Sequence, residues 1–332
     1  MARSGLHACK LARIIASKLL PPVSAHPPSD SRSSAPIDLA RVRGLFDDSA
    51  RVAESGFLRR EIAHRMLERL SLVRIEPAHV LDAGCGEGAD LSALQKRFPR
   101  AMLFGLDASP AMLQQARQHQ QAAHSAMRRL LRQWLPASGK DAGAALLCGN
   151  FSQLPLPVHA VDIVWSNLAL HWHPQPDQVF VEWRRVLRTD GLLMFSCFGP
   201  DTFKEIRAAF AAVDRTPHTL PFVDMHDFGD MLVNAGFTTP VMDMETLTVT
   251  YTSVDKLLAD VRAWGGNPLD TRRRGLLGRD AWRRVRQALE ENRRADGTIP
   301  LTFEVIYGHA FRPAPRKTAS GESIIRFDLP KK

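Results

Sequence analysis

Glycines and acids lie together at the end of a predicted strand. The run Val80–Gly88, Val-Leu-Asp-Ala-Gly-Cys-Gly-Glu-Gly, follows an apolar stretch and precedes a helical pattern, as a nucleotide-binding turn requires. Gly84 and Gly86 let the backbone turn tightly and approach a ligand where a Cβ would intrude. Asp107 ends the next predicted strand, where an acid can accept hydrogen bonds from both hydroxyls of a ribose.

Two kinds of nucleotide site compete for this motif. A dinucleotide fingerprint is GxGxxG, whereas the glycines here are spaced GxGxG and Ala89 stands where the last one would be. Asp82 also differs from that fingerprint. It is similar to the acid in the first motif of class I S-adenosylmethionine methyltransferases, which helps to hold the methionine end of the cofactor. We expect S-adenosyl-L-methionine as cofactor, with a dinucleotide or a purely structural glycine turn as alternatives. The expected cofactor-binding residues are Asp82, Gly84, Gly86, Asp107, Ala108, Met112, Asn150, Phe151 and Asn167.

Polar residues also follow the third and fourth predicted strands. Asn150 and Phe151 come where class I methyltransferases, which the first motif resembles, contact adenine. Those enzymes usually have Asp at the position of Asn150. The Asn150 side-chain carbonyl can still accept a hydrogen bond from the exocyclic amine of adenine. The run 162–172 ends in Asn167 and His171-Trp172, and ligands of open α/β sheets bind at such strand ends. His171 is either a catalytic group or part of the pocket wall, and Trp172 is predicted to be wall. No spacing of His, Cys or acids predicts a metal site.

Alternating strand and helix patterns surround these residues. Strands are predicted at 78–83, 101–106, 145–148, 161–166, 192–198, 241–249 and 301–311. Helices are predicted at 57–71, 89–98, 110–121, 178–187, 201–213 and 225–235, with residues 122–143 as a basic insertion that extends the third of them. Such βα repeats predict an α/β fold with a Rossmann-like, mostly parallel seven-stranded sheet and helices on both faces. The segment 253–294 would be a basic helical insertion between the last two strands.

Composition limits the class of protein. The chain has 332 residues, of which 45% are hydrophobic and 24% charged, and no apolar run is long enough to cross a bilayer. Four scattered cysteines predict reduced thiols in a cytoplasmic protein. Residues 1–36 are expected to be a disordered extension or a mitochondrial transit peptide, 37–313 the catalytic domain, and 314–332 a flexible tail.

The net charge of +9 makes a polyanionic partner a candidate, and composition alone does not choose among such partners. Residues 272–294 carry nine arginines against three acids, and nucleic acid, an acidic protein or a membrane surface could each bind them. A solvated helix face is the plainer alternative.

The chain resembles a named family, the malonyl-acyl-carrier-protein O-methyltransferases that begin pimelate formation in biotin synthesis. The likeness runs from about Val42 to Arg312 and includes Arg43–Asp47, the helix 60–67, the run 166–172 and the Gly-Pro-Asp-Thr run at 198–207. An arginine hydroxylase that assists complex I assembly shares that last run and is the alternative. The family usually carries a Tyr after its Phe-Asp, on the lid over the cofactor, and here residues 48–55 contain none.

The resemblance implies methyl transfer to the free carboxylate of a malonyl thioester on an acidic acyl carrier protein. A carboxylate is already ionised near pH 7, so no general base is required. The residues expected to hold it are His171 and Arg207, and the carrier protein is expected to dock on Arg272, Arg273, Arg274, Arg283 and Arg286. A nucleic-acid methyltransferase is a less favoured alternative, because no nucleic-acid-binding module is recognisable. No membrane partner is expected.

Overall fold

A computed structural model describes residues 35–48, 56–131, 143–264 and 266–315, with side chains of 124–131 left out. The chain divides into the units Met1–Arg32 and Ser33–Lys332. The first unit and the C-terminal tail lie outside the described residues, so the predictions for them stay predictions. Ala35 is already buried, which places the start of the packed domain at least two residues before the predicted Ile37.

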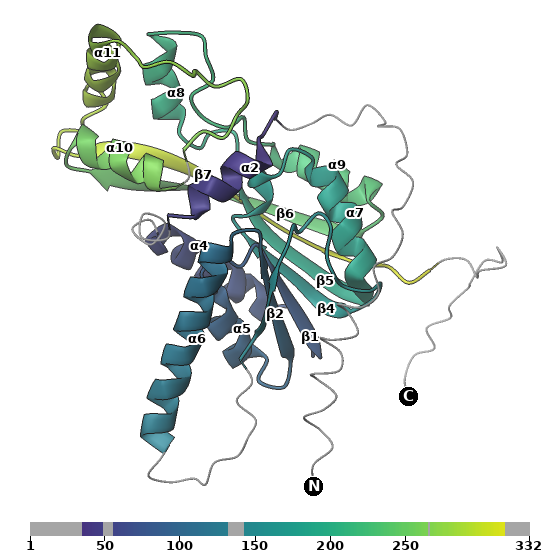
Figure 1. Ribbon diagram of the computed structural model, residues 1–332. Coiled ribbons are helices and arrows are strands. Elements are labelled where there is room, and N and C mark those ends of the chain that lie inside the picture. The colour runs from purple at the N-terminus through teal and green to yellow at the C-terminus, as the bar shows by residue number, and fades with distance from the viewer. Residues whose placement is uncertain (1–34, 49–55, 132–142, 265, 316–332) are drawn as a thin grey trace, which may run out of the picture. The chain divides into compact units, whose positions relative to one another are not determined.

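The order of elements confirms the βα alternation (Figure 1). The strands of the described residues are β1 His79–Ala83, β2 Met102–Asp107, β3 Ala145–Cys148, β4 Val161–Asn167, β5 Leu187–Phe198, β6 Thr238–Tyr251 and β7 Ile299–Phe311. The helices are α2 Leu39–Phe46, α4 Gly56–Ser71, α5 Ala89–Arg97, α6 Pro110–Leu131, the 3-10 turn η1 Leu170–Trp172, α7 Pro176–Val186, α8 Lys204–Ala211, α9 Met225–Asn234, α10 Val254–Ala263 and α11 Arg279–Glu290.

The seven strands that the structure describes form one sheet in the order β3-β2-β1-β4-β5-β7-β6. The pairs from β3 to β5 are parallel, and β7 runs antiparallel to both of its neighbours. The chain moves outward from β1 to β3 on one side and from β4 on the other, so the strand order reverses between β1 and β4. Ligands of such sheets bind at the carboxyl ends of the strands beside this reversal.

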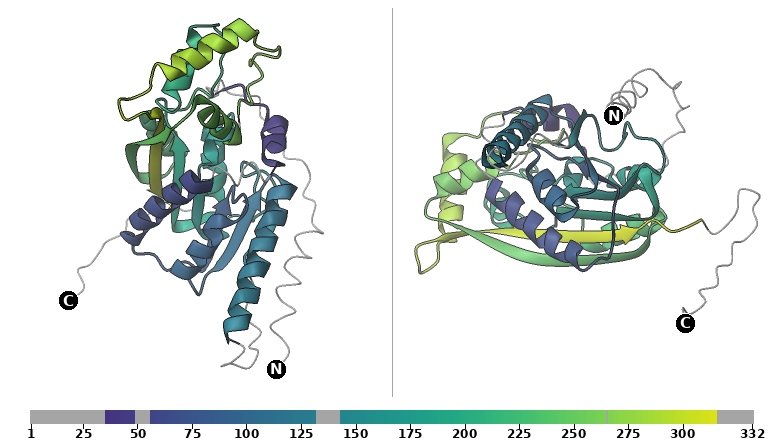
Figure 2. Two further views of the ribbon diagram at one scale, coloured as in Figure 1. Left: turned by 90° about the vertical axis from the view of Figure 1, so that its left-hand side faces the viewer. Right: turned by 90° about the horizontal axis from the view of Figure 1, so that it is seen from below.

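Successive residues of the central strands pack into two cores on opposite faces, because side chains alternate along a strand. Val80 and Ile163 join the core under α4, α5, α8, α10 and α11. Leu81 and Val164 join the core under α7 and α9. Figure 2 shows helices on both faces of the sheet. Burial on both faces explains why these strands read as continuous apolar runs.

Helix α6 begins where the sequence places it and continues further. The Ser109 hydroxyl accepts a hydrogen bond from the Met112 amide at 3.3 Å and so acts as the N-cap. The helix reaches Leu131, about three turns beyond Gln121, which agrees with the prediction that the following residues extend it. Residues 132–142 lie outside the described part.

The segment between β6 and β7 forms α10 and α11, as predicted. Helix α11 packs beside α8 at one end of the unit (Figure 1). None of the described helices is long and apolar enough to span a membrane.

Candidate functional site

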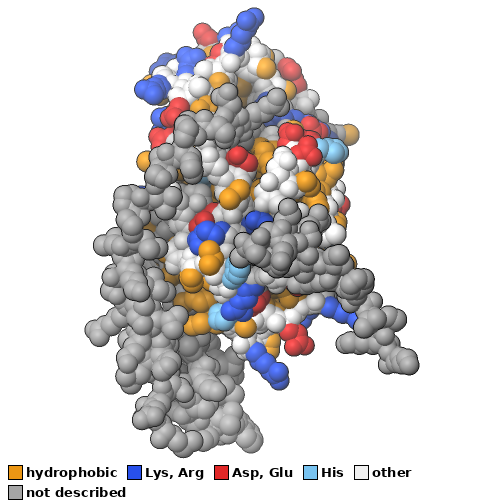
Figure 3. All heavy atoms as spheres, turned by 90° about the vertical axis from the view of Figure 1, so that its right-hand side faces the viewer, with side chains coloured by type: hydrophobic (Ala, Val, Ile, Leu, Met, Phe, Trp, Pro, Cys, Tyr) orange, Lys and Arg blue, Asp and Glu red, His pale blue; other side chains and the backbone are white. Residues whose placement is uncertain are grey.

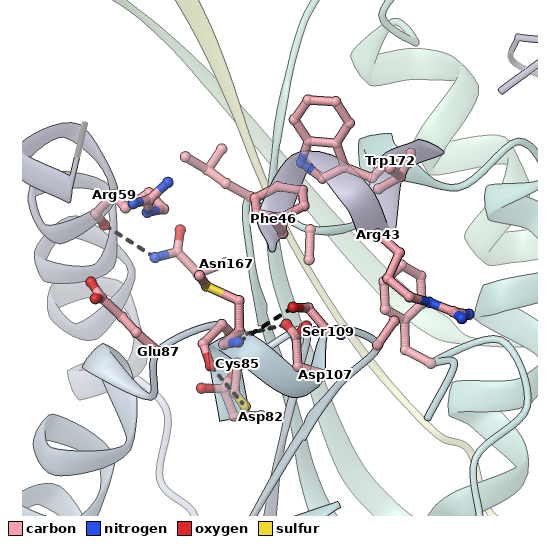
Figure 4. Close-up of a pocket in the computed structure, with 18 of the residues that line it drawn as sticks. Arg43, Phe46, Arg59, Asp82, Cys85, Glu87, Asp107, Ser109, Asn167 and Trp172 are labelled. Carbon is pink, nitrogen blue, oxygen red and sulfur yellow. Dashed lines mark hydrogen bonds between the residues drawn. The ribbon is translucent and has the colours of Figure 1, made fainter. Parts of the chain in front are cut away.

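A cavity of about 180 Å³ opens at the carboxyl ends of β1, β2 and β4 (Figure 4). It lies beside the reversal of strand order, where the topology predicts a ligand. All nine residues predicted to bind the cofactor line it: Asp82, Gly84, Gly86, Asp107, Ala108, Met112, Asn150, Phe151 and Asn167. Their individual contacts with a cofactor stay predictions.

The glycines of the turn after β1 have different tasks. Gly84 has φ +85°, and a Cβ there would lie 2.4 Å from the Cβ of Ala169, so Gly84 lets two segments of protein pack closely. Gly86 has φ +52°, and a Cβ there would meet no protein atom within 4 Å. Because Gly86 lines the cavity, its bare backbone leaves room for a ligand rather than for a neighbouring side chain.

Asp107 is fixed at the end of β2 by backbone donors. One carboxylate oxygen accepts from the Gly86 amide at 2.9 Å and the other from the Ser109 amide at 2.8 Å. Burial raises the pKa of this carboxyl, and these hydrogen bonds act in the opposite direction. The Ala108 amide also interacts with this carboxylate, which has about four acceptor sites, so Asp107 keeps capacity for a further donor such as a hydroxyl.

Asp82 is a buried acid that lacks a full set of partners. It is 2% exposed, and among the described residues its Oδ2 atom has no hydrogen-bond partner. Burial and the nearby carboxyls of Asp90 and Asp107 raise its pKa well above the usual range. A cationic ligand would relieve both the desolvation and the repulsion. S-adenosyl-L-methionine carries an ammonium and a sulfonium group and two ribose hydroxyls, so these residues fit it.

The cavity is covered by helices that precede the sheet in sequence. Helix α2 contributes Val42, Arg43 and Phe46, and the Phe46 ring meets the Trp172 ring edge to face at 5.5 Å. Just after α2, an Asp47 carboxylate oxygen accepts from the Ser109 hydroxyl at 3.0 Å, which ties the end of α2 to the start of α6. The predicted lid segment 48–55 lies almost wholly outside the described residues.

Helix α4 places Arg59 over the opposite side of the cavity (Figure 4). The Asn167 side-chain amide, at the end of β4, donates to the Arg59 carbonyl and to Asp90, both at 3.1 Å. The Trp165 indole also donates to Asp90, at 2.9 Å. Asn167 therefore connects α4, α5 and the sheet where the cavity opens.

Sequence reasoning missed Arg43, Phe46, Arg59 and Asp90 as lining residues. The apolar spacing of Leu39, Val42 and Phe46 does signal an amphipathic helix. Nothing in that spacing tells which edge of the sheet the helix covers, because the pairing is a long-range tertiary contact.

A second cavity of about 220 Å³ lies next to the first. Its lining is mostly aromatic and aliphatic and comes from the ends of β4 and β5, from α8, α10 and α11 and from the loops between them; it includes Trp172, Phe198, Phe222, Trp264 and Trp282. A small space of about 40 Å³ shares Phe46, Arg59 and Trp172 with the first cavity and His171, Trp172, Phe198 and Trp264 with the second. The three spaces are neighbours, and Trp172 lines all of them.

The structure separates the two residues predicted to hold the substrate carboxylate. His171 lines the second cavity and the small connecting space, and burial lowers its pKa to about 3. Burial therefore favours the neutral imidazole over the imidazolium in the ligand-free protein. The Arg207 guanidinium donates to the carbonyl oxygens of Pro200 and Thr202 and lines none of the three cavities in the described residues. Arg207 closes a turn instead of facing the site.

Asn150 and Phe151, the residues predicted to contact adenine, line the cavity. The Asn150 side-chain oxygen accepts from the Ser152 amide at 2.9 Å, so its geometry is fixed before any ligand binds. Phe151 packs its ring near those of His173 and Trp183. Trp172 forms part of the wall, which confirms that prediction.

The Gly-Pro-Asp-Thr run, residues 199–202, has a structural role. The Glu304 carboxylate accepts from the Asp201 amide at 2.6 Å, and Thr202 exchanges hydrogen bonds with the Glu304 backbone at 3.0 Å. A Cβ on Gly199 would lie 2.7 Å from the Glu304 Cδ atom. This turn joins the end of β5 to β7 and delays the start of α8 to Lys204, whereas the sequence predicted a helix from Asp201.

Comparisons with known proteins agree with this geometry. Residues 81–195 match the family described as "Methyltransferase domain". The YcgJ protein of Bacillus subtilis shares the fold at a TM-score of 0.50 and 17% identity, covering 76% of this chain and all of that one.

Much closer relatives are found among curated proteins. The malonyl-acyl-carrier-protein O-methyltransferase of Laribacter hongkongensis is 46% identical over 87% of this chain and 96% of its own length. The enzyme of the same name from Gallionella capsiferriformans is 43% identical, again over 87% of this chain and 96% of its own length. At this identity and coverage, the chain belongs to the malonyl-acyl-carrier-protein O-methyltransferase family.

Proposed function

We propose that this protein transfers a methyl group from S-adenosyl-L-methionine to the free carboxylate of a malonyl thioester on an acyl carrier protein. The observation that carries the proposal is the similarity to curated enzymes of that name along 87% of the chain. The cofactor cavity and the apolar cavity beside it supply the two compartments that the reaction needs. In the family that this chain resembles, this reaction begins pimelate formation in biotin synthesis.

The cofactor, when bound, supplies a methyl group on a positively charged sulfur. Asp82 offers a negative charge to the cationic end, Asp107 accepts from the ribose, and Gly86 leaves the backbone bare beside it. The substrate carboxylate is ionised near pH 7, so the protein need not remove a proton. An oxygen of that carboxylate forms the new C–O bond as the C–S bond breaks.

Catalysis then depends on alignment and on the exclusion of water. Phe46, Trp172 and Leu168 form apolar walls where the two cavities meet. A poorly hydrated carboxylate held in line with the methyl group is a better nucleophile than one in bulk water. Esterification also removes the negative charge from the acyl end, which suits later entry into an apolar elongation site.

The carrier protein is expected to dock beside the second cavity. Helix α11 contributes Trp282 to that cavity and carries Arg283, whose side chain is 75% exposed. In Figure 3, Lys and Arg side chains gather at the upper end of the face shown, with acidic ones beside them. Opposite charges at the rim of an interface mainly raise the association rate.

The predicted arginines are not equally available for docking. Arg286 pairs with Asp255, and Arg273 pairs with Asp214 at 3.1 Å. Arg272 donates to the Leu269 carbonyl at 3.0 Å. Arg283 also pairs with Asp280, at 3.0 Å, but both side chains are largely exposed. Arg274 is exposed as well, so within this set Arg274 and Arg283 are the better candidates for a carrier contact.

A direct test measures methyl transfer from labelled S-adenosyl-L-methionine to malonyl and acetyl acyl carrier protein. We expect a base-labile methyl ester on the malonyl form only. Rescue of a biotin-requiring bacterial strain that lacks its own malonyl methyltransferase is the cellular counterpart. Absence of an ester on malonyl acyl carrier protein would overturn the proposed function.

A further inference from the structure

The small space between the two cavities is where the reacting groups must meet. It shares Phe46, Arg59, Leu168 and Trp172 with the cofactor cavity, and His171, Trp172, Phe198 and Trp264 with the apolar cavity. A substrate held in the apolar cavity would have this space between it and the cofactor. The groups lining it therefore determine which acyl terminus is accepted.

Arg59 is the one charged side chain among the described residues that line this space. The other lining residues are phenylalanine, tryptophan, leucine and the neutral His171. A carboxylate that left water for such surroundings would need an opposite charge there. A guanidinium matches a carboxylate with two parallel hydrogen bonds, which fixes orientation as well as charge.

The position of Arg59 is built into the fold. Its carbonyl accepts from the Asn167 amide at 3.1 Å, which joins this turn of α4 to the end of β4. Leu58, the preceding residue, is 3% exposed in the core beneath the helix. The Arg59 side chain starts from this anchored backbone and lines both the cofactor cavity and the connecting space.

Resting on the proposed function, we infer that Arg59 is the residue that binds the free carboxylate of the acyl substrate and thereby selects half-thioesters of dicarboxylic acids. The apolar cavity takes the uncharged thioester portion. Arg207 and His171, which the sequence suggested for this task, do not hold the carboxylate by charge: the first turns back to the backbone, and burial favours the neutral form of the second.

Two acids near Arg59 keep its guanidinium charged but also compete with the substrate carboxylate for it. Glu87 and Asp90 lie within electrostatic range of Arg59 and favour its charged form, while burial disfavours it. The Asp90 carboxylate already accepts from Trp165 and Asn167, so these donors share its charge. The substrate carboxylate would join this network and compete with both acids for the guanidinium.

The test compares two ligands in two proteins. Binding of malonyl acyl carrier protein and of its methyl ester is measured in the presence of S-adenosylhomocysteine, together with steady-state methylation. The wild-type protein should prefer the free acid. In Arg59→Gln we expect the preference to vanish and kcat/KM to fall by about 100-fold or more, as for removal of one partner of a buried ion pair.

Matched variants separate this role from others. Arg60→Gln removes an exposed arginine one position along the same helix and should change neither quantity. Arg59→Lys keeps the charge but loses the paired geometry, so it should retain part of the preference and guards against a folding defect in Arg59→Gln. Because Arg59 also lines the cofactor cavity, S-adenosylhomocysteine affinity can change, but it should fall by much less than malonyl affinity in both Arg59 variants.

Three results would overturn the inference. They are a preserved preference in Arg59→Gln, a loss of S-adenosylhomocysteine affinity as large as the loss of malonyl binding, or a lost preference in Arg262→Gln but not in Arg59→Gln. Arg262 lines the apolar cavity and is the alternative cation for binding the carboxylate. If the wild-type protein itself forms no methyl ester, the proposed function fails, and that failure is seen before any variant is compared.

Discussion

Alanine at Gly84 and at Gly86 should damage the protein in different ways. Both positions have positive φ, so alanine there costs about 1–2 kcal/mol of folding free energy from backbone strain alone. At Gly84 the new Cβ would also overlap the Ala169 Cβ at 2.4 Å, an overpacking that adds about 1–3 kcal/mol. We therefore expect a total cost of about 2–5 kcal/mol for Gly84→Ala, and only the strain for Gly86→Ala.

The affinity for the ligand should be affected in the opposite order, with the larger loss in Gly86→Ala. The Gly86 Cβ would point into the cavity, where no protein atom lies within 4 Å, so the methyl group would occupy ligand space. Chemical denaturation gives the stability change, and calorimetric titration with S-adenosylhomocysteine gives the affinity of the folded fraction. Gly86→Ala should lose affinity while remaining the more stable of the two variants.

Ala169→Gly provides the control. In the double variant with Gly84→Ala, the overlap disappears but the backbone strain remains, so part of the lost stability should return. Wild-type affinity in Gly86→Ala would refute the placement of the cofactor against this turn. Equal stability of Gly84→Ala and Gly86→Ala would refute the assignment of Gly84 to packing.

Three further predictions concern protonation, the boundary of the domain and the carrier protein. The Asp82 pKa is raised above its ordinary 3.8 in the ligand-free fold, so above pH 3.8 the native state binds more protons than the unfolded state. The free energy of unfolding should therefore fall as the pH rises between these two pKa values. Over the same range the affinity for a cationic ligand should rise, because Asp82 becomes charged. Asp82→Asn should flatten both trends in melting curves recorded with and without S-adenosylhomocysteine, and an unchanged pH slope would point to Asp90 or Asp107 instead. Deletion of residues 2–32 should leave the melting temperature unchanged, whereas deletion of 2–38 should lower it because Ala35 and Ile37 pack with Leu220 and Leu269; equal effects would contradict this boundary. Arg274→Glu with Arg283→Glu should raise KM for the acylated carrier protein in a salt-dependent way without affecting a small malonyl thioester, and equal loss with both substrates would exclude docking.

The sequence predicted the βα core and the cofactor residues because both depend on local patterns. Strands buried on both faces are continuous apolar runs, and the Asp82–Gly86 turn must follow the first of them. Parallel strands bring their carboxyl ends to one edge, so residues such as Asp107 and Asn167 could be placed together without knowledge of side-chain contacts.

The acceptor side was harder to predict, because its geometry depends on contacts between distant segments. Arg207 has the right charge and lies near the correct strand end, yet the turn before α8 leaves two carbonyls that its guanidinium satisfies. His171 lines the second cavity and the small space but not the cofactor cavity, and the burial that lowers its pKa is something no sequence window reveals. Arg59 is one of several arginines on an amphipathic helix, and only the packing of α4 against β4 distinguishes it from Arg60.

The apolar cavity is built mostly from residues beyond the stretch that matches the general methyltransferase domain. That match ends at residue 195, while most of the cavity lining comes from Phe198 to Trp282. Under the proposed function, most of the lining of the acceptor cavity thus follows the cofactor-binding strands in the chain, with the long strand β5 between them. A chimera that exchanges residues 198–282 between relatives should change the preference for the thioester portion of the substrate. Methyl-donor affinity, and the requirement for a free carboxylate that we assign to Arg59, should stay with the parent that supplies the first half. New acceptors could therefore be engineered without altering the glycine turn or Asp107.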